Sequence, residues 1–119
     1  MRSADDIDGC IRACDSAAAS SAVTLTLSDK NPRWMFTLDP NSRLKPMGSW
    51  DDLKSRRQDL VPAYAANGAV YVVRVDHFKA SHGFFDSDSV GYVMPRERSV
   101  DIDEAIDLAW AKALLDQTR

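Results

Sequence analysis

Several features that define common protein classes are scarce in this sequence. The chain of 119 residues has only two cysteines and five glycines, and its formal net charge is −3. No apolar run approaches the length that crosses a membrane, and the N-terminus lacks the basic and apolar regions of a signal peptide. A net acidic charge argues against nucleic-acid binding. We therefore expect a cytoplasmic protein that binds neither membranes nor nucleic acid.

Two kinds of site are also missing. The glycines are not clustered, and neither GxxxxGK nor GxGxxG occurs, so no familiar loop for phosphate groups is present. Cys10 and Cys14 lie four residues apart on a predicted helix, without a CxxC pair or a nearby histidine. We therefore interpret them as buried core thiols, not as a metal or redox site.

The length predicts a single domain, residues 1–119, with a modest core. Ser3 and Asp6 predict a capping box that opens a helix to about residue 20, whose apolar stripe is Ile7, Ile11, Cys14 and Ala18. Further helices are expected over 51–57, 76–81 and 104–117, the last with a packing stripe that contains Ile106 and Trp110. Strands are expected over 22–27, 34–38, 69–75 and 92–94.

This order of elements predicts an α/β layered domain with a largely parallel sheet. The strands over 22–27 and 34–38 would form a hairpin or a crossover pair. Asn67-Gly68 is a strong turn signal before the strand over 69–75, and the valines on both faces of that strand predict a central position in the sheet.

Alternation of apolar and acidic residues marks Val100, Asp101, Ile102 and Asp103. In an extended segment both aspartates face the same way, roughly 7 Å apart. Two carboxylates of this kind suit a hydrated Mg²⁺ ion that shares phosphate oxygens with a substrate. The alternative is that Asp103 caps the final helix and Asp101 is a solvated loop residue.

Two further stretches contain candidate binding residues. Basic residues crowd the segment from 43 to 57, where Arg56 and Arg57 either belong to a solvated face or grip an anionic ligand. Phe84 and Phe85 are adjacent, so in extended structure at least one of them faces the surface or a pocket. The chain has two histidines, His77 and His82. We interpret both as surface residues, because neither has a carboxylate or cysteine partner in the sequence.

The sequences RRQDLVPAY, NGAVY and PRERSVDIDE resemble the C-terminal half of the acylneuraminate cytidylyltransferases, and the resemblance runs from about Ser3 to Leu115. It implies a truncated domain of the nucleotide-diphospho-sugar transferase type, which is Rossmann-like. Segments of the PARGGSK and LQPTSPLR types, with which that family binds nucleotide, are absent. The chain therefore looks like the back half of an enzyme about twice its length. Val61 stands where the family usually has proline.

The resemblance also implies roles for seven residues. Arg57 matches the arginine that reaches the substrate across a dimer and is the candidate catalytic residue. Asn67 and Tyr71 would contact an acidic nine-carbon sugar, and Phe84 and Phe85 would form the apolar wall for its N-acyl group. The remaining two would hold Mg²⁺: Asp101 and Asp103.

The function implied is transfer of CMP from CTP to N-acetylneuraminate or a legionaminate-type sugar, between which the resemblance does not choose. Without a nucleotide-binding half, we expect the chain to be inactive alone and to bind CTP only when an N-terminal half is supplied. The alternative is a non-catalytic module that binds the acidic sugar or forms oligomers. In either case we expect a homodimer, with the region 56–64 at its interface.

Overall fold

The computed structural model describes residues 2–117, and its contacts divide the chain into two compact units. Unit 1 combines the N-terminal segment to Thr26 with the chain from Ala66 onward. Unit 2 is Leu27–Ala65. Both helices and strands are present, so the predicted α/β class is confirmed.

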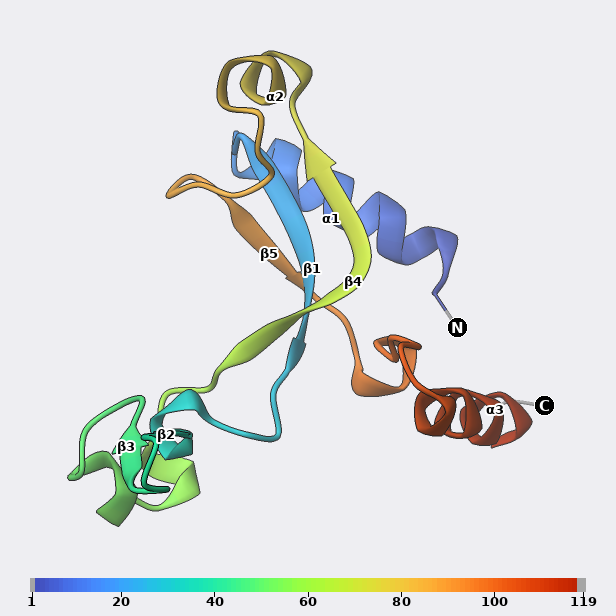
Figure 1. Ribbon diagram of the computed structural model, residues 1–119. Coiled ribbons are helices and arrows are strands. Elements are labelled where there is room, and N and C mark those ends of the chain that lie inside the picture. The colour runs from blue at the N-terminus through green and yellow to red at the C-terminus, as the bar shows by residue number, and fades with distance from the viewer. Residues whose placement is uncertain (1, 118–119) are drawn as a thin grey trace. The chain divides into compact units, whose positions relative to one another are not determined.

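A three-stranded sheet forms the centre of unit 1, in the order β4-β1-β5 (Figure 1). The middle strand β1 (Ser21–Leu27) is parallel to β5 (Val90–Val93). The strand β4 (Tyr64–Val73) runs antiparallel to β1, because the Arg74 N–H, just after β4, donates to the Ser20 carbonyl, just before β1, at 2.9 Å. The sheet is therefore mixed, where the sequence predicted a largely parallel one.

The strand predicted at the centre of the sheet lies at its edge. It is β4, and the prediction of a central position is wrong, because only one face of β4 packs against the core, through Val70 and Val72. Asn67-Gly68 lies inside this strand instead of in a turn before it. Gly68 has φ of +66°, so the left-handed backbone that the dipeptide favours occurs here within a strand.

The helix α1 (Ala4–Ser16) packs against the sheet (Figure 1). The predicted capping box is confirmed, since the backbone N–H and the Oγ of Ser3 each lie 3.0 Å from Asp6 Oδ2. The predicted apolar stripe is wrong for three of its four members: Ile7 and Ile11 are 48% and 42% exposed, and Ala18 is exposed beyond the end of the helix. The buried face is instead formed by Asp6, Gly9, Cys10 and Cys14.

Close approach of the helix to the sheet explains this face. A Cβ on Gly9 would lie 2.5 Å from the ring of Tyr92 on β5, so only glycine lets α1 sit at this distance. The core beneath consists of small side chains, with both thiols fully buried as predicted. Its members and the residues packed on it are Cys10, Cys14, Ala19, Ala22, Val70, Val72, Val90 and Tyr92.

Two more helices complete unit 1: α2 (Val75–Ser81) and α3 (Ala105–Gln117). The predicted packing stripe of α3 is exposed, with Ile106 at 70% and Trp110 at 53%, and the buried residue of this helix is Ala111. Among residues 2–117, no helix has both the length and the apolar character needed to cross a membrane.

Unit 2 is built on a small antiparallel pair, β2 (Phe36–Leu38) with β3 (Leu44–Pro46). The predicted pairing of 22–27 with 34–38 is therefore wrong, because β2 bonds to the strand that follows it. The helix expected over 51–57 is replaced by two 3₁₀ turns, Asp52–Lys54 and Arg57–Asp59. None of residues 27–65 is buried.

Candidate functional site

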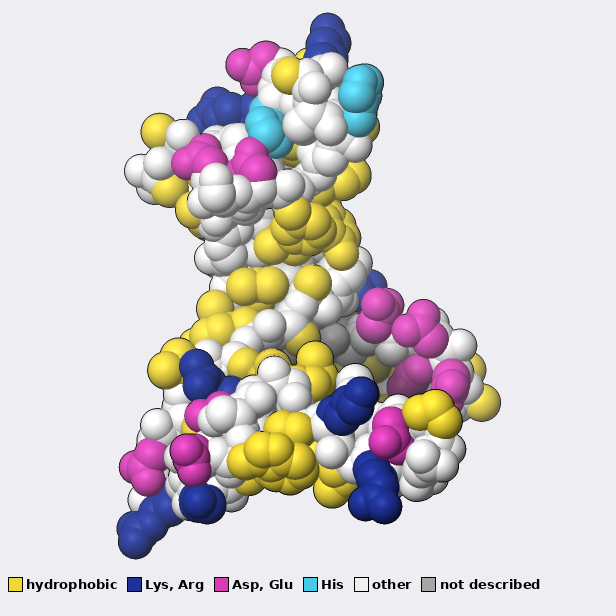
Figure 2. All heavy atoms as spheres, turned by 60° about the vertical axis from the view of Figure 1, so that its left-hand side comes forward, with side chains coloured by type: hydrophobic (Ala, Val, Ile, Leu, Met, Phe, Trp, Pro, Cys, Tyr) yellow, Lys and Arg dark blue, Asp and Glu magenta, His cyan; other side chains and the backbone are white. Residues whose placement is uncertain are grey.

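Three of the residues singled out in the sequence meet in unit 1. The ring of Tyr71, on β4, lies 5.7 Å from that of Phe84 and 5.9 Å from that of Phe85, between ring centres. Both contacts are tilted or edge-on, the geometry that aromatic quadrupoles favour. The three side chains remain 42–59% exposed, so they form an open apolar wall. Figure 2 shows hydrophobic side chains open to solvent in the part of unit 1 that carries both histidines.

A fourth ring that the sequence analysis missed joins this wall. Phe78 on α2 lies 5.5 Å from Phe84 at an interplanar angle of 43°, and it is 40% exposed. We define the aromatic cluster as Tyr71, Phe78, Phe84 and Phe85. The sequence could have indicated this contact, because Phe78 is the large apolar residue of a very short predicted helix shortly before the Phe84-Phe85 pair.

The loop that carries Phe84 and Phe85 is fixed by the Asp86 carboxylate. It accepts hydrogen bonds from the Asp88 N–H at 2.8 Å and from Ser20 Oγ at 3.0 Å, and His77 Nε2 lies 3.1 Å from it. The Asp88 N–H is the main cause that lowers the pKa of Asp86, with Ser20 and His77 adding to it. The sequence indicated no carboxylate partner for His77, which was predicted to be a surface residue, but folding brings Asp86 to it from nine residues away and leaves 21% of its side chain exposed.

Asn67 is 4% exposed, and its side chain is bonded within the fold. Its Oδ1 accepts from Thr24 Oγ1 at 2.7 Å, and its Nδ2 donates to Ser99 Oγ at 3.0 Å and toward Met94 Sδ at 3.3 Å. The amide thus links β1, β4 and the segment after β5. Its role as a sugar contact stays a prediction.

Asp101 lies beside β4. A Cβ on Gly68 would be 2.8 Å from Asp101 Oδ2, and Arg2 Nη2 is 3.8 Å from Oδ1. Asp103 is exposed, and its backbone N–H donates to Asp107 Oδ2 at 3.1 Å. Residues 99–104 contain no strand, so the extended segment expected there is not part of the sheet.

Both candidate metal ligands are open to solvent, with 59% of the Asp101 side chain exposed. Within residues 2–117, no three His, Cys, Asp or Glu side chains gather into a set that would hold a metal ion by themselves. Two accessible carboxylates are nevertheless the donor set of a largely hydrated Mg²⁺ that takes its other ligands from water and phosphate. The residues present are compatible with such an ion.

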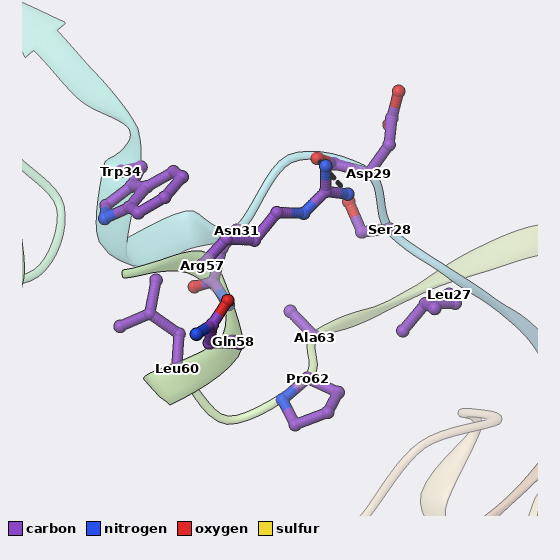
Figure 3. A pocket seen from close by; sticks show the side chains of 10 residues that line it. All are labelled: Leu27, Ser28, Asp29, Asn31, Trp34, Arg57, Gln58, Leu60, Pro62 and Ala63. Carbon is purple, nitrogen blue, oxygen red and sulfur yellow. Dashed lines mark hydrogen bonds between the residues drawn. The ribbon is translucent and has the colours of Figure 1, made fainter. Parts of the chain in front are cut away.

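Arg57 belongs to unit 2, where it lines a cavity of about 200 Å³ (Figure 3). Its Nη2 donates to the Asp29 carbonyl at 3.1 Å, which fixes the position of the guanidinium. The cavity combines this cation with apolar and amide side chains. It is lined by Leu27, Ser28, Asp29, Asn31, Trp34, Arg57, Gln58, Leu60, Pro62 and Ala63.

Comparison with known proteins identifies the relatives of this chain. No family model matches it. It is 32% identical over 88 residues to an N-acylneuraminate cytidylyltransferase of Streptococcus agalactiae serotype V, and 33% identical over 89 residues to the enzyme of the same name from Escherichia coli O18:K1:H7. These stretches cover 73% and 75% of this chain.

The matched stretch therefore belongs to the family of N-acylneuraminate cytidylyltransferases, as its motifs predicted. It makes up only 21% of each of these relatives. These relatives are thus well over twice as long as this chain. The resemblance had implied an enzyme only about twice as long.

Proposed function

We propose that this chain supplies the sugar-contacting part of an N-acylneuraminate cytidylyltransferase and does not form a CMP-sugar by itself. The family match supports this function over most of the chain. The mixed sheet with α1 on it is compatible with one part of a larger Rossmann-like fold of the nucleotide-diphospho-sugar transferase type.

The observation that carries the proposal is the contact of Tyr71 with Phe84 and Phe85. These residues come from segments more than ten positions apart, yet their rings adjoin and stay open to solvent. An exposed aromatic wall binds the apolar faces of sugars and acyl methyl groups, for which water is a poor competitor. The ligand proposed is N-acetylneuraminate or a legionaminate-type acid.

Arg57 of a second copy would pair with the carboxylate of such a sugar, because a guanidinium forms two parallel hydrogen bonds to a carboxylate. Asp101 and Asp103 would hold Mg²⁺, which when bound neutralises charge on the phosphates of CTP. Asn67 would act through the backbone it fixes, since its own amide is bonded to Thr24 and Ser99.

The reaction of the complete site would be attack of the anomeric hydroxyl of the sugar on the α-phosphate of CTP, with release of pyrophosphate. This chemistry depends on positioning and charge neutralisation. The chain carries no glycine-rich loop for the triphosphate, so we expect no CMP-sugar from this chain with CTP, Mg²⁺ and N-acetylneuraminate. Turnover under these conditions would contradict the proposal.

Sugar binding is tested separately by saturation-transfer NMR with N-acetylneuraminate. We expect binding by the wild type that is weakened in Phe85→Ala and retained in Trp110→Ala, which removes an exposed aromatic outside the cluster. Rescue of activity by the N-terminal part of a relative would support a split enzyme, whereas binding without rescue would support a sugar-binding module.

A second candidate function, homo-oligomerisation, is favoured by unit 2. All of its side chains are at least partly exposed, and several are large and apolar: Leu38, Leu44, Met47, Trp50, Val61 and Tyr64. Exposed apolar surface of this extent is typical of an interaction face. We propose that unit 2 contacts a second copy through the region 56–64. Light scattering at micromolar concentration should show a dimer, and a clean monomer would rule this out.

A further inference from the structure

The ring of Phe84 contacts two other aromatic rings. Its ring centre lies 5.7 Å from that of Tyr71 on β4 and 5.5 Å from that of Phe78 on α2. A phenylalanine ring has no polar atom, so the local backbone and packing together select its rotamer. The neighbour on α2 is therefore as important for this ring as the neighbour on the sheet.

The position of Phe78 is itself fixed by backbone and side-chain contacts of α2. The helix α2 ends at His82, which has a left-handed φ of 55° and donates its N–H to the Phe78 carbonyl at 2.8 Å. In the preceding turn, His77 Nε2 lies 3.1 Å from the Asp86 carboxylate beyond the Phe84-Phe85 pair. The contact between His77 and Asp86 thus joins the helix to the loop beyond the aromatic pair.

The ring of Phe78 does not have to bind a ligand to influence the site. The ring of Phe78 contacts that of Phe84, whereas Tyr71 contacts both Phe84 and Phe85. Removal of the Phe78 ring would free Phe84 to turn into the space left on α2. The wall that Tyr71, Phe84 and Phe85 present would then lose its shape without losing any of its own members.

We propose that Phe78 is a positioning residue that sets the orientation of Phe84 and thereby the selectivity for an N-acyl group on the sugar. This inference rests on the proposed function. It adds a residue on α2 to the specificity determinants of the sugar site. Phe78→Leu keeps an apolar side chain on the helix but removes the ring contact.

The test compares two acidic nine-carbon sugars, N-acetylneuraminate and the analogue with a hydroxyl in place of the acetamido group. In Phe78→Leu, we expect the affinity for N-acetylneuraminate to fall roughly three- to tenfold, which is the weight of an aromatic pair, and the affinity for the hydroxyl analogue to stay unchanged. The ring resonances of Phe84 should shift in the same variant. The matched control is Val75→Ala, at an exposed position of the same helix.

The results distinguish failure of the proposed role of Phe78 from failure of the proposed sugar site. If the wild type binds sugar, two results for Phe78→Leu would overturn the role of Phe78 and leave the proposed function intact. One is an equal loss of affinity for both sugars, and the other is unshifted Phe84 resonances. Absence of binding of either sugar by the wild type would overturn the proposed sugar site and the role of Phe78 with it.

Discussion

The guanidinium of Arg98 binds the carboxylate of Asp6 through two hydrogen bonds, although the residues are 92 positions apart in the chain. Arg98 Nη2 donates to Oδ1 at 2.9 Å and Nε donates to Oδ2 at 3.1 Å. The Asp6 side chain is fully buried, whereas 39% of the Arg98 side chain is exposed. This pair joins the first turn of α1 to the 3₁₀ turn Arg96–Arg98, which follows β5. It therefore fixes the loop that leads to Asp101.

Removal of the Arg98 guanidinium should destabilise unit 1. In Arg98→Met the buried Asp6 carboxylate loses its ionic partner, and we expect a loss of roughly 2–4 kcal/mol in the free energy of unfolding. Urea denaturation followed by circular dichroism measures this change. Arg12→Met, at an exposed arginine of α1, is the control and should stay within about 0.5 kcal/mol. Equal stability of the two variants would contradict the prediction.

The same pair should make stability depend on pH in the acid range. The guanidinium of Arg98 is the main cause that lowers the pKa of Asp6 from 3.8 to about 2. The unfolded chain therefore takes up this proton first on acidification, so the contribution of the pair is complete above about pH 4 and is lost as the pH falls through 2. It amounts to about 2 kcal/mol.

Denaturation curves between pH 2 and pH 5 test this contribution as a difference between the wild type and Asp6→Asn. The comparison is needed because hydrogen bonds also lower the pKa values of Asp52 and Asp86. The difference should grow as the pH rises through the window. A constant difference from pH 2 to pH 5 would show that the pKa of Asp6 is not lowered by folding.

Gly68 should resist substitution for two separable reasons. Its φ of +66° disfavours any side chain, and a Cβ would lie 2.8 Å from Asp101 Oδ2. We expect Gly68→Ala to cost roughly 1–3 kcal/mol, of which Asp101→Ala in the same chain recovers the steric part. Gly83→Ala is the control, because its nearest neighbour atom would be 3.9 Å away. Thermal denaturation of these three variants and of the wild type gives the comparison.

Replacement of the buried Asn67 amide should also be costly. In Asn67→Ala, Ser99 Oγ loses the N–H group that donates to it, and a gap opens beside Thr24. The expected loss is roughly 2–3 kcal/mol, measured by urea denaturation. Asn41→Ala, on an exposed turn of unit 2, provides the control. A neutral Asn67→Ala would show that the amide is not a structural link and would free it for a role in ligand binding.

The two thiols should be unreactive in the folded chain. Cys10 and Cys14 are 0% and 2% exposed, and burial raises the pKa of Cys10. Because the thiolate is the reactive form, an aromatic disulfide reagent should label neither cysteine under native conditions and both in denaturant. Rapid native labelling of either cysteine would contradict the core assignment.

Features that depend on neighbours in the sequence could be predicted from it. The capping box of Ser3 and Asp6 is such a feature, because its partners are three residues apart. The burial of the two thiols was also predicted, since cysteines without metal or redox partners behave as small apolar residues. Asn67-Gly68 was predicted as a turn before a strand, but it lies inside β4, with Gly68 at a positive φ.

Features set by contacts between distant segments could not be read from local pattern. The buried face of α1 follows from the contact of Gly9 with Tyr92, which a hydrophobic stripe does not register. The apolar residues of α3 recur at helical spacing, yet they do not form a buried face, and Trp110 is exposed. In the candidate site, Tyr71, Phe84 and Phe85 were grouped through resemblance, whereas Phe78 and the pairing of His77 with Asp86 emerged from the fold.

The two ends of unit 2 meet, because the Ser28 N–H donates to the Ala63 carbonyl at 2.9 Å. The strands that lead into and out of it, β1 and β4, are already neighbours in the sheet. Residues 27–65 thus behave as a long hairpin connection, and a tight turn of a few residues in their place would lower the entropic cost of closing the connection by roughly 2 kcal/mol. Evolution can accordingly lengthen, shorten or exchange this segment without rewiring the sheet that carries the aromatic cluster.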